Sequence, residues 1–359
     1  MPLPTKDQIS KAIENNNNLI DPSLSGFKTL DGIVGPECYS GGFCLVFPIT
    51  NGNEKFAFRV WHTEIDGIKS RLTKIASFLK STNSPYFVDF EILDQGILVP
   101  LYNNDQIIEA IKMKWVEGKN LSEYLEDLIN NQGLSLNECK TKILNLAEKF
   151  ITMVKELHSL HISHGDLQHG NIIIDKKDNI FLVDYDSVFV PTFNGEMQVT
   201  TGLPAYQHPN RKTSLKKASV KDDYYSERII YVSLLALAED PGIWNSLKNS
   251  DGEKDEHSFI LNENDISDLK NSVLFNKIKR LPNQQINLIA TDIENCSDPE
   301  TLEPIENILR DKYSEQPDSI IIDITDWPEL EKPEKPTYTK TPIIINFDSK
   351  TAKQRYSQN

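Results

Sequence analysis

The sequence has few cysteines, and none of them is spaced to form a site. Its 359 residues include only four, which are Cys38, Cys44, Cys139 and Cys296. No two of them have the C-x-x-C spacing that zinc sites and redox pairs use, and their scatter does not indicate a disulfide framework. We therefore expect neither structural zinc nor disulfides, and a protein of the reducing cytoplasm.

Long apolar runs and an excess of basic residues are also missing. The most apolar segment, 229–238, is short and closely flanked by charges, and the N-terminus does not have the basic and then apolar pattern of a signal peptide. Lysine and arginine number 38 against 53 aspartates and glutamates, which gives a net charge of -15. This balance argues against nucleic-acid binding as the main activity. We expect no membrane and no nucleic acid among the partners.

Two acidic motifs stand out in a chain that is long enough for two lobes with a hydrophobic core. Residues 164–171 read H-G-D-L-Q-H-G-N, and residues 182–186 read L-V-D-Y-D. Between them, the apolar segments 172–174 and 180–183 predict a pair of strands. This strand pair would bring the two motifs close together.

The polar residues of these motifs have the chemistry of phosphoryl transfer. Asp166 lies five residues before Asn171, so one carboxylate can lie beside an acceptor hydroxyl while the amide and Asp184 bind Mg²⁺. The alternative is that these residues only cap a turn and end a strand. The motifs resemble the catalytic loop H-R-D-x-x-x-x-N and the metal-binding motif D-F-G of the protein kinase superfamily. The resemblance implies that Asp166 is the catalytic base, that Asn171 and Asp184 hold Mg²⁺, and that ATP is the phosphoryl donor.

Two earlier segments resemble nucleotide-binding strands of the same superfamily. Gly41 and Gly42 precede an apolar strand, as in a degenerate Gly-rich loop, with Cys44 where the last glycine is expected. The strand 55–60 resembles the V-A-I-K strand, with Arg59 in the lysine position, and an arginine can bind phosphate bidentately. The helix that follows has no glutamate to pair with Arg59. The alternatives are an ordinary hairpin and an arginine at a strand edge that faces solvent.

The strand 107–115 alternates apolar residues with lysines, after which the pattern becomes helical. In protein kinases this join is the hinge that holds adenine through backbone groups. The resemblance makes Met113 the gatekeeper and places the hinge at Lys114 to Val116. It implies a set of ATP-binding residues, which are Gly41, Gly42, Val46, Ala57, Arg59, Met113, Lys114 and Val116.

The second half of the chain continues the kinase pattern. Ser135 and Glu138 predict a capping box at the start of an amphipathic helix. Segment 202–209, G-L-P-A-Y-Q-H-P, resembles the end of an activation segment, and Asp223 resembles the aspartate that begins the buried anchoring helix. Basic residues in this region form either a docking site for an acidic peptide or a solvated loop. They are Arg211, Lys212, Lys216, Lys217 and Lys221.

The motifs occur in kinase order, and the forms H-G-D-L-Q-H-G-N, D-Y-D and Y-Q-H-P are closest to a bacterial kinase-like group. The resemblance implies an α+β, bilobal protein kinase-like fold, with a small antiparallel β-sheet N-lobe and a mainly helical C-lobe. We expect an N-terminal extension at 1–27, the N-lobe at 28–116, the C-lobe at 117–315 and a proline-rich tail at 316–359. An apolar patch in the tail, 343–347, either adds a strand to a partner or to this domain, or belongs to a disordered tail.

Three functions remain open. The first is an ATP- and Mg²⁺-dependent serine/threonine protein kinase that transfers the γ-phosphoryl group to a protein hydroxyl. The second is a small-molecule phosphotransferase of aminoglycoside-kinase type, which Gly165 and Gln168 favour because they replace an arginine and a lysine of protein kinases. The third is a nucleotide-binding pseudokinase scaffold, which Arg59, Cys44 and the missing glutamate favour. Segment 202–209 favours protein substrates, and the intact catalytic and metal-binding residues favour an enzyme. We therefore expect the first.

Overall fold

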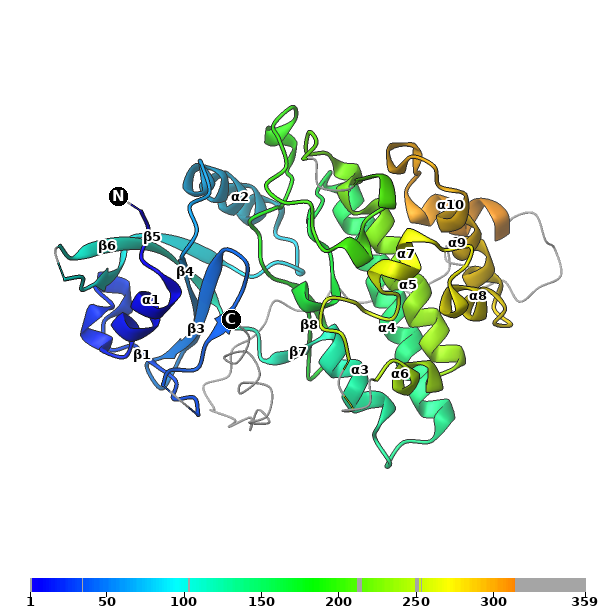
Figure 1. Ribbon diagram of the computed structural model, residues 1–359, viewed down its shortest axis with the longest axis horizontal. Coiled ribbons are helices and arrows are strands. Elements are labelled where there is room, and N and C mark those ends of the chain that lie inside the picture. The colour runs from blue at the N-terminus through cyan, green and yellow to red at the C-terminus, as the bar shows by residue number, and fades with distance from the viewer. Residues whose placement is uncertain are drawn as a thin grey trace. The chain divides into compact units, whose positions relative to one another are not determined.

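The computed structural model describes residues 2–313, except for 34, 103, 212–214, 249–251 and 253. In this part of the chain, Figure 1 shows a unit built on a β-sheet and a unit built mainly of helices. Of the described residues, the sheet unit holds those up to 81 together with 88–116, and the helical unit holds 82–87 and 117–313. The predicted α+β class is confirmed. The tail at 316–359, with its predicted strand, lies outside the described residues.

The sheet unit contains a six-stranded antiparallel sheet in the order β1-β3-β4-β6-β5, and β2 also pairs with β3. Its strands are β1 Lys28–Thr29, β2 Tyr39–Ser40, β3 Cys44–Thr50, β4 Lys55–Trp61, β5 Phe90–Val99 and β6 Gln106–Lys114. Polar turn residues separate these apolar strands. In the β3–β4 turn, the Asn51 side chain accepts the amides of Asn53 and Glu54, and Gly52 has a φ of 89°, which favours glycine.

The segment 2–27 covers one face of this sheet. Helix α1 (Lys6–Ile13) begins with a capping box at Thr5, and its apolar face buries Ile9 and Ile13. These side chains pack into one core with Phe47 and Phe58 of the sheet. The described residues of the N-terminal segment and the strands lie in the same compact unit.

Lys112 lies on the same face and is almost completely buried. Its Nζ lies 4.5 Å from the centroid of the Phe56 ring and 5.2 Å from that of Phe27, and it donates to the Ser23 carbonyl at 3.1 Å. Aromatic faces attract a cation, so this site can hold a buried ammonium. As predicted for 107–115, apolar residues and lysines point to opposite faces of the sheet. The face that carries Lys112, however, is covered by the N-terminal segment.

The opposite face of the sheet carries Glu109 of β6. It forms an ion pair with Lys69 of α2 (Ile68–Thr82), and Lys69 also lies 2.9 Å from Asp94. These carboxylates raise the pKa of Lys69, but the pair is exposed and contributes little to stability. The buried side chains of α2 are Arg71, Leu72, Ile75 and Leu79.

The helical unit is organised around α5, whose residues from Tyr224 to Ala238 are all buried. This confirms the helix predicted after Asp223. The predicted capping box of Ser135 and Glu138 is present at the start of α4. The helices are α3 Leu121–Ile129, α4 Leu136–Ser159, α5 Tyr224–Glu239, α6 Gly242–Ser246, α7 Glu263–Ser267, α8 Val273–Lys279, α9 Gln284–Asn295 and α10 Ile305–Tyr313. None of the helices among the described residues is long and apolar enough to cross a bilayer.

A small sheet in this unit has the order β7-β8-β9, with strands Gly118–Asn120, Ile172–Asp175 and Ile180–Leu182. The predicted strand pair between the two acidic motifs is thus confirmed, with Ile172 opposite Leu182 and Ile174 opposite Ile180. Because β8 and β9 are antiparallel, the residues just before β8 and just after β9 lie at the same end of the hairpin.

A buried histidine joins three helices of this unit. His158 of α4 lies 2.9 Å from Glu227 of α5 through Nε2 and 2.9 Å from Glu306 of α10 through Nδ1. Burial disfavours the charged imidazole, but the hydrogen bonds to the two glutamates outweigh it and raise its pKa to about 10. The cation in turn lowers the pKa of Glu306.

We expect His158→Gln to destabilise the protein by about 3–5 kcal/mol, because it removes the cation that compensates the buried Glu227. The folded-state pKa lies above the ordinary 6.5, so this contribution is complete below pH 6.5 and is lost as pH rises toward 10. Thermal unfolding from pH 6 to 10 measures it, with His161→Gln, at an exposed position, as the control. A loss of stability that is constant across this range would contradict the assignment.

Candidate active site

Asp223 holds the backbone of the loop at 164–171. The amide of His164 donates to one oxygen of the Asp223 carboxylate, and the amide of Gly165 donates to the other at 3.0 Å. Asp223 is fully buried at the start of α5, so the loop is fixed to the most buried helix of the unit. This contact restrains the two residues that immediately precede Asp166.

The His164 side chain joins this loop to the end of β9. It is completely buried, and its Nε2 lies 2.9 Å from the carbonyl oxygen of Val183. Burial lowers its pKa, so the ring is neutral at physiological pH and Nε2 carries the proton that it donates to Val183. Val183 in turn donates its amide to the Asn171 carbonyl at 3.0 Å. These hydrogen bonds to Val183 therefore fix the position of the second acidic motif relative to the first.

Asp166 and Asn171 are in direct contact. The Asn171 Nδ2 donates to the Asp166 carbonyl at 2.8 Å and to its carboxylate at 3.3 Å. Burial and then the charge of Asp184 raise the pKa of Asp166 to about 6, although the Asn171 hydrogen bond works in the opposite direction. A carboxylate with this pKa is ionised at neutral pH and can still accept a proton.

Asp184 follows β9 and has a φ of 67°, a conformation that non-glycine residues rarely adopt. The structure therefore brings Asp166, Asn171 and Asp184 together at one end of the β8–β9 hairpin. The Asn171 Nδ2 is used in the hydrogen bonds to Asp166, so its side-chain Oδ1 could bind a metal ion.

This donor set fits Mg²⁺. The ion commonly takes one or two protein oxygens and completes its octahedron with water and substrate phosphates. Asn171 and Asp184 supply one amide oxygen and one carboxylate. The described residues contain no cluster of three histidine, cysteine, aspartate or glutamate side chains that could hold a metal.

The predicted end of the activation segment lies against this loop. The Leu203 amide donates to the Asp166 carboxylate, and the Tyr206 hydroxyl hydrogen-bonds Nδ1 of His169. The His169 ring also stacks on Phe259, at 6.1 Å between centroids. Burial lowers the pKa of His169 to about 4, so Nδ1 accepts the Tyr206 proton. Sequence reasoning did not find this contact, because an isolated histidine in a loop has no distinctive pattern.

Gly165 occupies its position because no other residue fits. Its φ is 78°, and a Cβ built on it would lie 2.3 Å from the carbonyl oxygen of Ser187. The obstacle is backbone, which cannot move aside as a flexible side chain would. The arginine that the kinase pattern places here is therefore excluded by the path of the chain after Asp184, a constraint that the sequence did not reveal.

We expect Gly165→Ala to destabilise the protein by at least about 2 kcal/mol, from backbone strain and steric overlap together. Gly195→Ala is the matched control, because Gly195 has a φ of 90° but its Cβ would meet nothing within 4 Å. Chemical denaturation of both variants separates the cost of backbone strain from that of steric overlap. Equal losses in both variants would show that the Ser187 carbonyl does not restrict this site.

In the sheet unit, the predicted nucleotide-binding residues lie on neighbouring strands. Val46 is opposite Arg59, and Ala57 is opposite Met113. Paired residues and residues two apart share a face of a sheet, so all four lie on the face opposite α1. Arg59 is 4% exposed on an interior strand, and its Nη2 donates to the Cys44 sulfur at 3.3 Å. The alternative of a solvent-facing arginine at a strand edge is wrong.

The glycine turn and the hinge residues also belong to this unit. The Gly41 amide donates to the Cys44 carbonyl at 2.9 Å, which closes the turn between β2 and β3. Gly42 has an ordinary φ and open space around it, so the fold itself does not require glycine there. Lys114, at the end of β6, donates its backbone amide to the Asp89 carbonyl at 3.0 Å, and Val116 is the last described residue of the unit.

Three of the four described basic residues after the segment have partners within the fold. Arg211 is buried, Lys216 lies 3.2 Å from Glu300, and Lys221 donates to the carbonyls of Glu300 and Leu302. Lys217 is exposed, and Lys212 lies outside the described residues. Two of the four described cations in this stretch, Lys216 and Lys221, therefore hold it to the region before α10.

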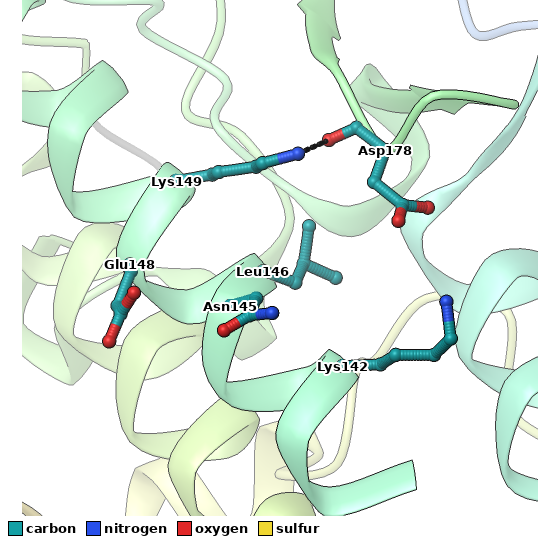
Figure 2. Close-up of a pocket in the computed structure, with 6 residues that line it drawn as sticks. All are labelled: Lys142, Asn145, Leu146, Glu148, Lys149 and Asp178. Carbon is teal, nitrogen blue, oxygen red and sulfur yellow. Dashed lines mark hydrogen bonds between the residues drawn. The ribbon is translucent and has the colours of Figure 1, made fainter. Parts of the chain in front are cut away.

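A pocket of about 250 Å³ lies along α4. Figure 2 shows that its lining residues come from α4 and from the β8–β9 turn, where Lys149 donates to the carbonyl of Asp178 at 2.8 Å. The turn is the end of the hairpin remote from Asn171 and Asp184. This pocket is therefore separate from the candidate active site.

Comparisons with known proteins agree with this geometry. Residues 40–314 match the family model described as the protein kinase domain. The interferon-induced, double-stranded RNA-activated protein kinase of Rattus norvegicus is 27% identical over 173 residues, which cover 47% of this chain and 31% of that protein. A probable serine/threonine-protein kinase of fowlpox virus is 26% identical over 187 residues, which cover 49% of this chain and 59% of that protein.

A serine/threonine-protein kinase of Saccharomyces cerevisiae is 23% identical over 252 residues, which cover 64% of this chain and 28% of that protein. The chain thus spans less than two thirds of the length of each of these relatives. The family model, however, covers well over half of the chain and includes both acidic motifs and the segment at 202–209. The chain belongs to the protein kinase domain family.

Proposed function

We propose that this protein is an ATP- and Mg²⁺-dependent serine/threonine protein kinase, which transfers the γ-phosphoryl group of ATP to a protein hydroxyl. The observation that carries the proposal is the meeting of Asp166, Asn171 and Asp184 at one end of the β8–β9 hairpin. The alternative, that these residues only cap a turn and end a strand, does not account for two carboxylates at this place, because each buried carboxylate costs desolvation energy.

In this proposal Asp166 orients the acceptor hydroxyl and takes its proton. Its carboxylate is held by the Leu203 amide and by Asn171, so its direction is set before the acceptor arrives. Asn171 and Asp184 hold Mg²⁺, which when bound neutralises charge on the phosphates. Catalysis then depends mainly on the orientation of the acceptor hydroxyl and on the neutralisation of phosphate charge.

The sheet unit supplies the nucleotide site. Arg59 contacts phosphates from the same face that carries Val46, Ala57 and Met113, which pack on the adenine and ribose. The glycine turn leaves the backbone at Gly42 uncovered by side chains, as close approach of phosphates requires. Backbone groups of Lys114 to Val116 bind adenine. We propose 28–116 and 117–315 as the two lobes of the kinase.

Protein substrates are favoured over small molecules by the segment at 202–209. Its Leu203 amide binds the catalytic carboxylate, so the segment borders the place where the acceptor hydroxyl must lie. The pseudokinase alternative lacks a reason for two carboxylates and an amide to converge in this way. We place the protein in the cytoplasm, with a protein substrate and with the tail at 316–359 as a docking segment for a partner.

The test is incubation of the purified chain with Mg²⁺, γ-labelled ATP and generic protein acceptors, followed by phosphoamino acid analysis. We expect label on serine or threonine, and none when EDTA removes Mg²⁺. Transfer to an aminoglycoside but not to protein would support the second function. Nucleotide binding without any transfer would support the pseudokinase.

A further inference from the structure

An aromatic contact crosses the sheet face opposite α1, which we call the nucleotide face because the proposed ATP-binding side chains lie on it. Tyr39 of β2 is opposite Val46, so its ring is on this face. Trp115 follows Met113 by two residues, and its amide continues the pairing with β4 by donating to the Lys55 carbonyl at 3.2 Å. The centroids of the Tyr39 and Trp115 rings lie 6.1 Å apart, with 45° between the ring planes. This distance is within the range of attractive aromatic pairs.

Each ring has a second contact. The Lys55 Nζ lies 4.1 Å from the centroid of the Trp115 ring, a distance at which an aromatic face attracts a cation. The Tyr39 hydroxyl donates to the Glu37 carboxylate at 2.6 Å, so it is paired without taking part in the ring contact. Both rings are partly buried. The pair is therefore a packed feature of the unit and not a contact between two exposed side chains.

The two rings come from opposite sides of the nucleotide face. In the sheet, β3 and β4 lie between β2 and β6, so the strands that carry the rings are not neighbours. Val46 of β3 and Ala57 of β4 are among the residues that the proposed function places against adenine and ribose. The ring pair thus joins the strand before the glycine turn to the hinge, across the strands that would carry the nucleotide.

The strand before the glycine turn is attached to the sheet over a short length. It pairs with β3 at only two positions, through Tyr39 and Ser40. It leads directly into the turn, where a Cβ built on Gly41 would lie 3.9 Å from the Cys44 sulfur. The turn therefore lies over this sulfur, and Cys44 is buried. A movement of β2 away from β3 would expose the Cys44 thiol.

We propose that Tyr39 and Trp115 form an aromatic clasp, which fixes β2 to the hinge and so holds the glycine turn in place for the phosphates of the nucleotide. The proposal rests on the proposed kinase function. Glycine gives the backbone of the turn more conformational freedom than other residues would, so a contact outside the turn is needed to restrict it. Both are positioning residues, because their effect on the phosphates passes through the backbone of the turn.

Labelling of Cys44 with N-ethylmaleimide tests the clasp without any nucleotide. Mass spectrometry assigns the label to each cysteine, and thermal unfolding shows whether each variant is folded. In Tyr39→Ala and in Trp115→Ala, the labelling rate of Cys44 should rise about 3- to 10-fold, the factor that corresponds to the loss of one aromatic pair. The rate at Cys139, which is buried in the helical unit, should not change.

Tyr39→Phe and Tyr102→Ala are the controls. The first keeps the ring and loses only the hydroxyl bond to Glu37, so its Cys44 should react at close to the rate of the wild type. Tyr102 is fully exposed in the same unit, so its loss should have no effect on the rate. If Cys44 reacts no faster in folded Tyr39→Ala and Trp115→Ala than in these controls, the clasp is overturned.

Equilibrium binding of Mg·ATP and of adenosine tests the link to the phosphates. In Tyr39→Ala the Kd for Mg·ATP should rise about 3- to 10-fold, whereas the Kd for adenosine, which has no phosphate, should stay close to that of the wild type. An equal loss for both ligands would show that the rings do not act through the turn, and would overturn the positioning role. If Cys44 labelling rises as expected but the wild type transfers no phosphate, the kinase function fails and the clasp stands.

Discussion

Replacing Asp166 with alanine is expected to reduce phosphoryl transfer by about 10²- to 10⁴-fold, the range that a positioned general base contributes. Nucleotide binding should stay close to that of the wild type, because Asp166 addresses the acceptor hydroxyl. Single-turnover transfer and equilibrium binding of Mg·ATP measure the two effects separately. In the wild type, transfer should fall as pH drops through about 6, the pKa of Asp166, since only the ionised carboxylate accepts a proton.

Asp175→Ala is the control for this experiment. Asp175 belongs to the same hairpin, but its carboxylate accepts the amides of Lys177 and Asn179 in the turn at the remote end. Its loss should cost about 1 kcal/mol of stability, as the loss of a cap does, and should leave transfer intact. Retained transfer in Asp166→Ala would remove Asp166 from catalysis. A joint loss of transfer and nucleotide binding would indicate misfolding.

The parts of the fold that the sequence predicted well are those with local causes. The capping box at Ser135, the β8–β9 hairpin and the buried helix after Asp223 each follow from residues close together in the chain. For the candidate site, the hairpin placed Asn171 and Asp184 at one end, because antiparallel pairing determines which residues meet.

The parts that the sequence did not predict depend on segments far apart in the chain. The burial of Lys112 requires the N-terminal segment to cover the sheet, and nothing near Lys112 indicates this. Gly165 meets the Ser187 backbone, and Arg211 meets Gln207, only once the chain after Asp184 has its folded path. These contacts lie around the loop of Asp166, so motif matching located the candidate base but not the packing around its loop.

The second large effect is expected for Asp184→Asn. An amide is a poor substitute for a carboxylate at a hard cation, so Mg²⁺-dependent ATP binding should weaken by at least about tenfold, or roughly 1.4 kcal/mol. Asparagine adopts positive φ readily, so the backbone at 184 should be kept and the loss should reflect the missing charge alone.

The matched control is Asp178→Asn, which makes the same change at another residue of positive φ, 61°, in the turn at the remote end of the hairpin. It should bind Mg·ATP as the wild type does. A second readout needs no metal. Because the charge of Asp184 raises the pKa of Asp166, the Asp166 pKa should fall in Asp184→Asn and stay at about 6 in Asp178→Asn. If both variants bind Mg·ATP equally well and leave the Asp166 pKa unchanged, Asp184 belongs neither to the metal site nor to the surroundings of the base.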